Sequence, residues 1–179
     1  MSSKVDQILM ALDQQFFWSL IFDYLEPEDL VSVASVCLTW WRLVYGRKST
    51  LEALRNCRDL DLANTGSMYL TVPPRYFTSL YRINLSSTSI SSRNFLKLAS
   101  SARQMRELSI ERCMGISESA IFEAKPLLRH LRSINVSHNK KITVLAIACL
   151  CSLDSLQEIR ARGIHMEFKE LLFLSKIFP

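Results

Sequence analysis

Glycine is scarce in this chain, with only four glycines among 179 residues, and they stand far apart in the sequence. A phosphate-binding loop needs closely spaced glycines so that the backbone can approach the phosphates, and no G-x-G or G-K-[ST] arrangement occurs. Histidine is also scarce: His130, His138 and His165 lack a metal-ligand spacing with one another or with the cysteines. We therefore expect no metal, no cofactor and no catalytic activity of the chain's own, so the chain is predicted not to be an enzyme.

Long apolar runs are missing as well. The longest, residues 143–153, has 11 residues, whereas a membrane-spanning helix needs about 20. Lys4, Asp6 and Asp13 interrupt the apolar segment that a secretion signal would require. The five cysteines form no C-x-x-C pair, which is typical of reduced, buried thiols. We expect a cytoplasmic or nuclear protein without a membrane partner.

Leucine is abundant, and charge is distributed unevenly. The chain has 49% hydrophobic residues, which argues against intrinsic disorder. The first fifty residues hold four Lys/Arg and six Asp/Glu, a net charge of −2. Residues 51–179 hold the other eighteen Lys/Arg and eleven Asp/Glu, a net charge of +7. This contrast suggests two modules with different partners.

Five segments share one spacing of apolar side chains. Their central positions are Leu60, Ile83, Leu108, Ile134 and Ile159, at steps of 23, 25, 26 and 25 residues. A second apolar residue stands three positions earlier and a third stands two positions later. This pattern and period are typical of leucine-rich repeats, whose units stack into a solenoid.

The spacing also predicts which side chains face the core. Leu60 and Leu62, two residues apart, should point to one side of a short strand and Asp61 to the other. Thr88, Cys113 and Asn139 stand where small polar groups can close the turn after a strand. Helices are expected between the strands, at 92–100 and 117–124, with a serine able to cap each start.

Polar residues that should point away from the core form a candidate binding face for a protein substrate. The proposed substrate-binding residues are Arg58, Tyr81, Asn84, Arg106, Arg132 and Asn135. Arginines aligned with a tyrosine could bind an acidic peptide or protein. The alternative is that these arginines are solvated and bind nothing. Eleven acids interspersed among eighteen Lys/Arg, without a recognised motif, argue against a nucleic-acid partner.

The fifth segment is degenerate, with Ala161 and Gly163 at its later positions. Residues 167–178 are expected to form one more helix. It could close the array, with Phe168, Leu171, Leu172 and Leu174 packed inward. Alternatively, the array is a truncated form of a longer one.

The first fifty residues carry a different pattern. Apolar residues recur at helical spacing from Phe17 to Leu25, and Pro27 suits the first turn of a second helix. The run Ile21-Phe22-x-Tyr24-Leu25-x-Pro27-x-Asp29-Leu30, followed by Val36-Cys37-x-x-Trp40-x-x-Leu43, resembles the F-box motif. With the repeats behind it, the whole chain resembles the F-box/leucine-rich-repeat proteins.

This resemblance implies an α/β fold class with two parts. Residues 1–48 would form an N-terminal three-helix F-box-like unit, and residues 49–179 a short leucine-rich-repeat solenoid of about five repeats. The implied function is that of a substrate-recognition subunit of a Skp–cullin–F-box E3 ubiquitin ligase. The F-box would bind a Skp-family adaptor, and through it a cullin-RING ligase, while the concave repeat face would bind an unidentified protein substrate.

The implied adaptor-binding residues are Phe17, Leu20, Ile21, Leu25, Pro27, Leu30, Val36 and Trp40. A unit of about 45 residues buries too little surface to hide so many large apolar side chains, so some should be exposed to a partner. Alternatively, they cap the first repeat. Family members usually open with a Leu-Pro pair where this chain has Asp13-Gln14. A second candidate function is therefore a non-catalytic repeat scaffold whose F-box no longer binds the adaptor.

Overall fold

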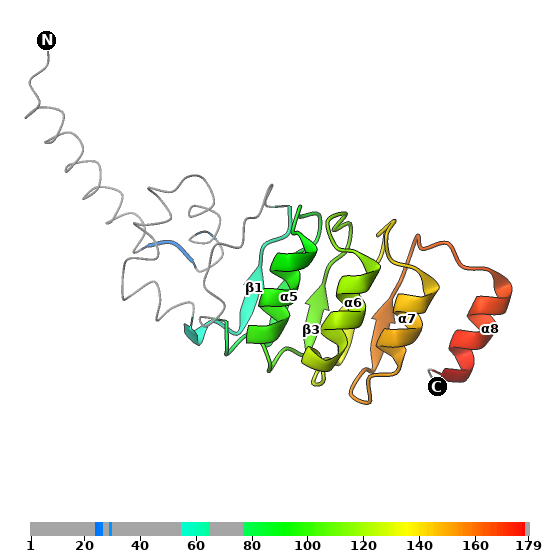
Figure 1. Ribbon diagram of the computed structural model, residues 1–179. Coiled ribbons are helices and arrows are strands. Elements are labelled where there is room, and N and C mark those ends of the chain that lie inside the picture. The colour runs from blue at the N-terminus through cyan, green and yellow to red at the C-terminus, as the bar shows by residue number, and fades with distance from the viewer. Residues whose placement is uncertain (1–23, 27–28, 30–54, 65–76, 178–179) are drawn as a thin grey trace, which may run out of the picture.

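The structure is a computed structural model, and it describes residues 24–26, 29, 55–64 and 77–177. These residues contain a five-stranded parallel sheet in the order β1-β2-β3-β4-β5 (Figure 1). The strands are β1 (Asp59–Asp61), β2 (Arg82–Asn84), β3 (Glu107–Ser109), β4 (Ser133–Asn135) and β5 (Glu158–Arg160). Each strand therefore pairs with the strand that follows it in the sequence.

The register of the sheet follows the apolar spacing of the sequence. The central residues Leu60, Ile83, Leu108, Ile134 and Ile159 are paired from each strand to the next. Backbone hydrogen bonds continue this register beyond the strands: the Leu85 amide donates to the Ser109 carbonyl at 2.8 Å, and the Ile110 amide to the Asn135 carbonyl at 2.9 Å. The predicted alignment of the five segments is confirmed.

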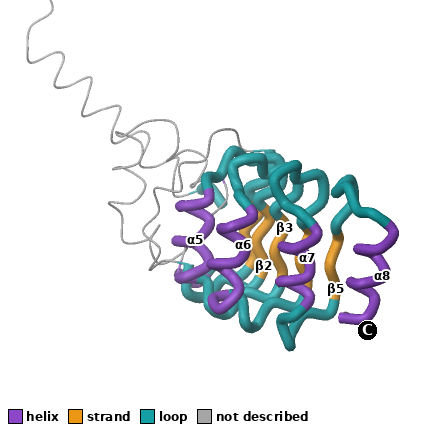
Figure 2. The backbone as a smooth tube through the Cα atoms, turned by 45° about the vertical axis from the view of Figure 1, so that its right-hand side comes forward, coloured by secondary structure: helices purple, strands orange, loops and turns teal. Residues whose placement is uncertain are grey.

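Helices connect the strands from β2 to β5, one more helix follows β5, and together they cover one face of the sheet (Figure 2). They are α5 (Ser92–Ser101), α6 (Glu118–Ala124), which continues into the 3-10 helix η2 (Lys125–Leu127), α7 (Val144–Cys151) and α8 (Phe168–Ile177). Parallel strands require such crossover connections. The α-helices contact one another in chain order, so they form a layer parallel to the sheet.

Side-chain caps explain where three of the helices begin. Ser91, Ser117 and Thr143 have extended backbones and accept hydrogen bonds from the amides of Asn94, Ala120 and Leu145, respectively. Each cap pairs one of the amides that lack a partner inside the first turn. The helices expected at 92–100 and 117–124 are confirmed. Ser117 caps the second as expected, whereas Ser91, one residue before the expected start, caps the first.

The core lies between the sheet and the helix layer. Leu60 and Leu62 are buried and Asp61 is exposed, as the alternation of strand side chains predicts. The helices contribute Phe95 and Leu98 from α5, and further apolar residues from α6 and α7. Each strand therefore presents apolar side chains to one face and polar side chains to the other.

Small polar side chains close the turns after the strands, as expected. The Thr88 hydroxyl donates to the Leu85 carbonyl at 2.7 Å, and the Cys113 thiol donates to the same carbonyl at 2.9 Å. The Asn139 amide donates to the carbonyls of Ile110 at 2.8 Å and Val136 at 2.9 Å. All three side chains are buried. These side chains give the Leu85 and Ile110 carbonyls a donor in addition to the backbone amides of Thr88 and Cys113, and Asn139 also pairs the Val136 carbonyl.

The same turns contain one residue each in the left-handed backbone region. These residues are Asn64, Ser87, Arg112, His138 and Gly163, with φ between 55° and 68°. Each lies four positions after the central strand residue of its segment. Only the last is a glycine, whose hydrogen side chain makes this conformation easy. A Cβ at Gly163 would lie 2.4 Å from Nδ1 of His138, so the position is also sterically restricted.

The expected fold class requires correction. The described residues form an α/β fold with a five-stranded parallel sheet and four α-helices, and neither a three-helix F-box-like unit nor a leucine-rich-repeat solenoid is evident among them. Apolar spacing determines which residues pair in the sheet, but it does not determine the connections. These differ in kind: ten residues in α5, seven in α6 followed by a 3-10 helix, and eight in α7. Of residues 1–48, where the three helices were expected, only 24–26 and 29 are described.

The last helix is also packed differently from the prediction. Leu171 and Leu172 of α8 are 50% and 52% exposed, so the expectation that both pack inward is wrong. Leu174 is partly buried against the core, and the side chain of Phe168 lies outside the described residues. Helix α8 is the last of the helix layer, and within the described residues only α7 flanks it closely. No described helix is long and apolar enough to cross a membrane.

Candidate functional site: the polar face of the sheet

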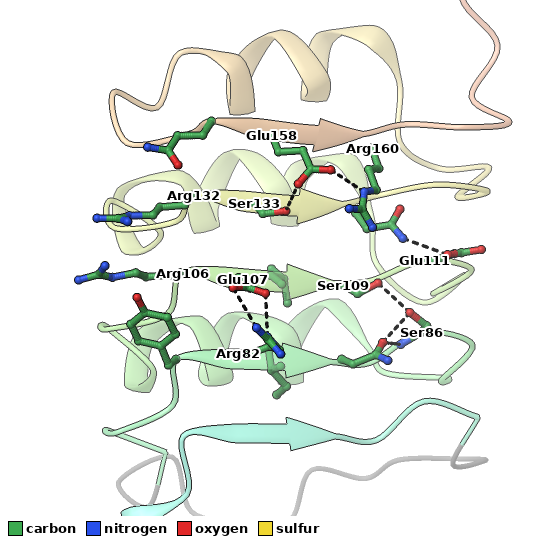
Figure 3. Close-up of a pocket in the computed structure, with 16 residues that line it drawn as sticks. Arg82, Ser86, Arg106, Glu107, Ser109, Glu111, Arg132, Ser133, Glu158 and Arg160 are labelled. Atoms are coloured by element: carbon green, nitrogen blue, oxygen red, sulfur yellow. Dashed lines mark hydrogen bonds and ion pairs between the residues drawn. The ribbon is translucent and has the colours of Figure 1, made fainter.

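The face of the sheet opposite the helices carries the candidate site, and we call it the polar face. A hollow of about 700 Å³ lies over strands β2 to β5 of this face (Figure 3). Five of the six predicted substrate-binding residues line it: Tyr81, Asn84, Arg106, Arg132 and Asn135. The sixth, Arg58, is exposed beside β1 and does not line the hollow. The structure therefore brings five of these residues to one surface.

One arginine of the polar face is neutralised by a glutamate on the next strand. Nε of Arg82 donates to Oε2 of Glu107 at 2.7 Å, and its second nitrogen contacts Oε1 at 3.2 Å. This two-point geometry is the favoured arrangement of guanidinium and carboxylate groups. The hydrogen bond and the charge of Glu107 raise the pKa of Arg82 above its ordinary value. The positive charge of Arg82 is therefore already balanced within the sheet.

A second arginine is balanced by a glutamate on its own strand, β5. Nε of Arg160 donates to Oε1 of Glu158 at 2.6 Å, and the Ser133 hydroxyl donates to Oε2 at 3.2 Å. The hydrogen bond from Arg160 lowers the pKa of Glu158 below its ordinary value, because it stabilises the ionised carboxylate. Figure 3 shows both contacts on the same carboxylate.

The two asparagines are also engaged within the face. Oδ1 of Asn84 accepts from the Ser86 hydroxyl at 2.6 Å, and that hydroxyl lies 2.7 Å from the Ser109 hydroxyl. Nδ2 of Asn135 donates to Oε2 of Glu111 at 3.0 Å. Oδ1 of each also accepts an amide hydrogen two residues later, from Ser86 and Ser137. These contacts tie the ends of the strands together and occupy part of each amide group.

The remaining arginines of the hollow, Arg106 and Arg132, form with Tyr81 and Gln157 what we call the cationic band. Each of these residues stands directly before its strand. The guanidinium carbon of Arg106 lies 4.8 Å from the centre of the Tyr81 ring, a cation–π contact. Among the described residues, neither Arg106 nor Arg132 forms an ion pair. In Figure 3 both arginines extend from the same end of their strands.

Backbone hydrogen bonds hold the cationic band in place. The Arg106 amide donates to the Tyr81 carbonyl at 2.8 Å, the Arg132 amide to the Arg106 carbonyl at 2.7 Å, and the Gln157 amide to the Arg132 carbonyl at 2.8 Å. Neighbouring strands are about 4.8 Å apart. The backbones of the two arginines are therefore set side by side by the sheet. Such a pair can bind carboxylate groups spaced along an extended chain.

The described residues contain no group of three His, Cys, Asp or Glu side chains placed to hold a metal ion. Burial raises the pKa of the Cys113 and Cys151 thiols above their ordinary value, so these thiols are poor nucleophiles. No protein-family model and no curated protein matches this sequence.

The predicted adaptor-binding residues fall almost entirely outside the described part of the chain. Phe17, Leu20, Ile21, Pro27, Leu30, Val36 and Trp40 all lie there. Leu25 is described, and its side chain is partly buried against the core. The neighbouring Tyr24 is 89% exposed. Adaptor binding by this segment stays a prediction.

Several residues of the hollow were missed by the sequence argument. Arg82, Glu107, Ser133 and Glu158 line it as well. A signal for one pair was present, because Arg82 and Glu107 occupy the same position of consecutive segments and carry opposite charges. Opposite charges at facing positions of neighbouring strands attract each other. The pairing in turn identifies the arginines that have no acidic neighbour.

Proposed function

We propose that this chain is the substrate-recognition subunit of a Skp–cullin–F-box ubiquitin ligase, without catalytic chemistry of its own. Its N-terminal motif binds a Skp-family adaptor and thereby a cullin-RING ligase. The polar face binds a protein substrate, and the complex works in the cytoplasm or the nucleus. The order and spacing of the apolar residues at 21–30 and 36–43 support the first part of this proposal.

The cationic band supports the second part. Arg82 and Arg160 are neutralised by Glu107 and Glu158, whereas Arg106 and Arg132 are not paired with any described acidic residue. Two uncompensated guanidinium groups on a hydrogen-bonded sheet favour an acidic segment of a partner protein. Because the sheet fixes their backbones, little backbone freedom is lost on binding.

Adaptor binding is tested by a pull-down with purified Skp-family adaptor. We expect the full chain to retain the adaptor and the double variant Leu25→Ala, Trp40→Ala to lose it. The double variant Arg106→Gln, Arg132→Gln is the control and should bind as well as the wild type. No association of the wild type would reject the ligase proposal and favour the non-catalytic scaffold. The absence of the Leu-Pro pair supports that alternative.

Substrate binding is tested on an array of synthetic acidic peptides. We expect Arg106→Gln with Arg132→Gln to weaken the bound peptides by about tenfold or more, because charge-assisted hydrogen bonds are lost. The control is Arg103→Gln with Arg129→Gln, which removes the same charge from exposed positions outside the hollow. Equal losses in both double variants would show a general charge effect and reject the assignment. Preference for single-stranded DNA over the peptides, with a steep salt dependence, would favour the nucleic-acid alternative.

A further inference from the structure

The outer edge of β5 has free backbone hydrogen-bonding groups. At β4 the Arg132 carbonyl accepts from the amides of Gln157 and Glu158. The amides of Val136 and His138 donate to the carbonyls of Arg160 and Arg162. The corresponding groups one segment later are the Gln157 carbonyl and the amides of Ala161 and Gly163. Within the described residues these groups make no hydrogen bond. A free edge of this kind can pair with another strand.

Apolar surface accompanies this edge. Ile159, Ala161 and Ile164 are only partly buried. By contrast, Ile134 and Val136, which correspond to Ile159 and Ala161 one segment earlier, are fully buried. On α8, three consecutive large side chains are about half exposed: Leu171, Leu172 and Phe173. Figures 1 and 2 place α8 at the same end of the molecule as β5, in the helix layer. Both layers therefore end in incompletely buried apolar side chains.

The charges on β5 indicate what can pair with it. Glu158 and Arg160 flank Ile159 and point to the polar face. If a second β5 pairs antiparallel, with Ile159 opposite Ile159, each Glu158 faces an Arg160 of the other copy. The same register places each free Gln157 carbonyl opposite a free Ala161 amide. The strand is thus complementary to itself in charge and in hydrogen bonding.

We propose that two copies of this chain form a two-fold symmetric dimer through their β5 edges. The symmetry axis passes between the two Ile159 residues, perpendicular to the sheet, so that both polar faces lie on the same side. The two α8 helices then approach each other across the junction and cover their exposed leucines and Phe173. Short length and charged side chains usually keep edge strands from pairing, but the two charges of β5 have opposite signs and attract a second copy in this one register. This dimer does not depend on the proposed ligase function.

Charge reversal tests the dimer, with the molar mass of the full chain measured by sedimentation equilibrium. We expect a dimer for the wild type, and a dissociation constant raised by about tenfold or more in both Glu158→Arg and Arg160→Glu, because each places like charges opposite each other. The double variant Glu158→Arg, Arg160→Glu restores opposite charges and should restore the dimer. As a control, Arg82→Glu with Glu107→Arg swaps an ion pair away from the edge and should leave the dimer unchanged.

A backbone variant tests the same edge without changing charge. Ala161→Pro removes an amide that is free in the single chain but paired in the dimer, so it should weaken dimerisation while circular dichroism shows unchanged folding. A wild type that stays monomeric up to about 100 µM would overturn the proposal. So would a dimer that both single reversals leave intact, or a double variant that fails to restore it.

Discussion

The two faces of the sheet differ in how their residues vary from segment to segment. On the core face, every central position from Leu60 to Ile134 is an aliphatic residue with at most 3% exposure. On the polar face, the residues that follow these positions are Asp61, Asn84, Ser109 and Asn135, and each has different partners. The core face therefore repeats the same kind of buried aliphatic side chain, whereas the polar face presents different side chains from strand to strand.

This difference means that the apolar side chains of the core face carry stability, whereas polar side chains within and directly before the strands carry binding. Truncating a side chain on the core face should destabilise the fold strongly. Truncating the neighbouring side chain on the polar face should leave folding intact. The expected effects fall in size from the core face, through the turns after the strands, to the polar face.

The largest effect is expected on the core face of β3. Leu108→Ala should lower the free energy of unfolding by about 2–5 kcal/mol, because it removes buried methyl groups and leaves a cavity. Ser109→Ala, one residue later on the polar face, should change it by less than about 1 kcal/mol. Urea denaturation of both variants measures the difference. Equal losses would contradict the separation of the faces.

A smaller effect is expected in the turns that close the strands. Asn139→Ala should cost about 1–3 kcal/mol, because the buried Ile110 and Val136 carbonyls lose a donor. Thr88→Val should cost less, since the Leu85 carbonyl keeps the Cys113 thiol as a partner at 2.9 Å. Thermal denaturation followed by circular dichroism ranks the two. A larger loss for Thr88→Val would show that the thiol does not replace the hydroxyl.

The smallest effect concerns the ionisation of Glu158 on the polar face. Because its pKa is lowered in the folded chain, chiefly by the hydrogen bond from Arg160, its contribution to stability is present above the ordinary glutamate pKa. This contribution is lost as the pH falls through the lower, folded pKa. NMR titration should find the depressed pKa, and Arg160→Gln should raise it toward the ordinary value. Arg162→Gln, which changes a nearby arginine without a bond to Glu158, should not.

The sequence allowed the sheet to be predicted in some detail. The spacing around Leu60, Ile83 and Leu108 identified the strands and their register, because apolar side chains two residues apart must face one core. Thr88, Cys113 and Asn139 were recognisable as turn residues since each stands at the same offset from its strand. The connections could not be derived in the same way, because helix length and the 3-10 helix η2 depend on packing between layers. The expected solenoid was inferred from the apolar spacing, and the three-helix unit from helical spacing and resemblance, and neither is evident among the described residues.

The candidate site was predictable only in outline. The columns of polar residues were visible, but the partners of each arginine were not. Arg82 and Arg106 look alike in the sequence, yet one contacts Glu107 and the other lies over Tyr81. Arg58 belongs to the same column as Arg106 but lies beyond the hollow. Such differences depend on side-chain contacts across strands about 25 residues apart, which spacing alone does not determine.

Pairing each strand with the next one in sequence also has a consequence for how the chain folds. Among the described residues, no sheet contact joins residues further apart than about one segment, as in Ile134 and Ile159, so this part of the chain needs no long loop to close before a neighbour can dock. Among the described strands, β1 and β5 each have only one neighbour, so opening should begin there, and amide hydrogen exchange should be faster at β1 and β5 than at β3. Pairing of two β5 edges would slow exchange at β5, because this strand would then lie in the middle of a shared sheet.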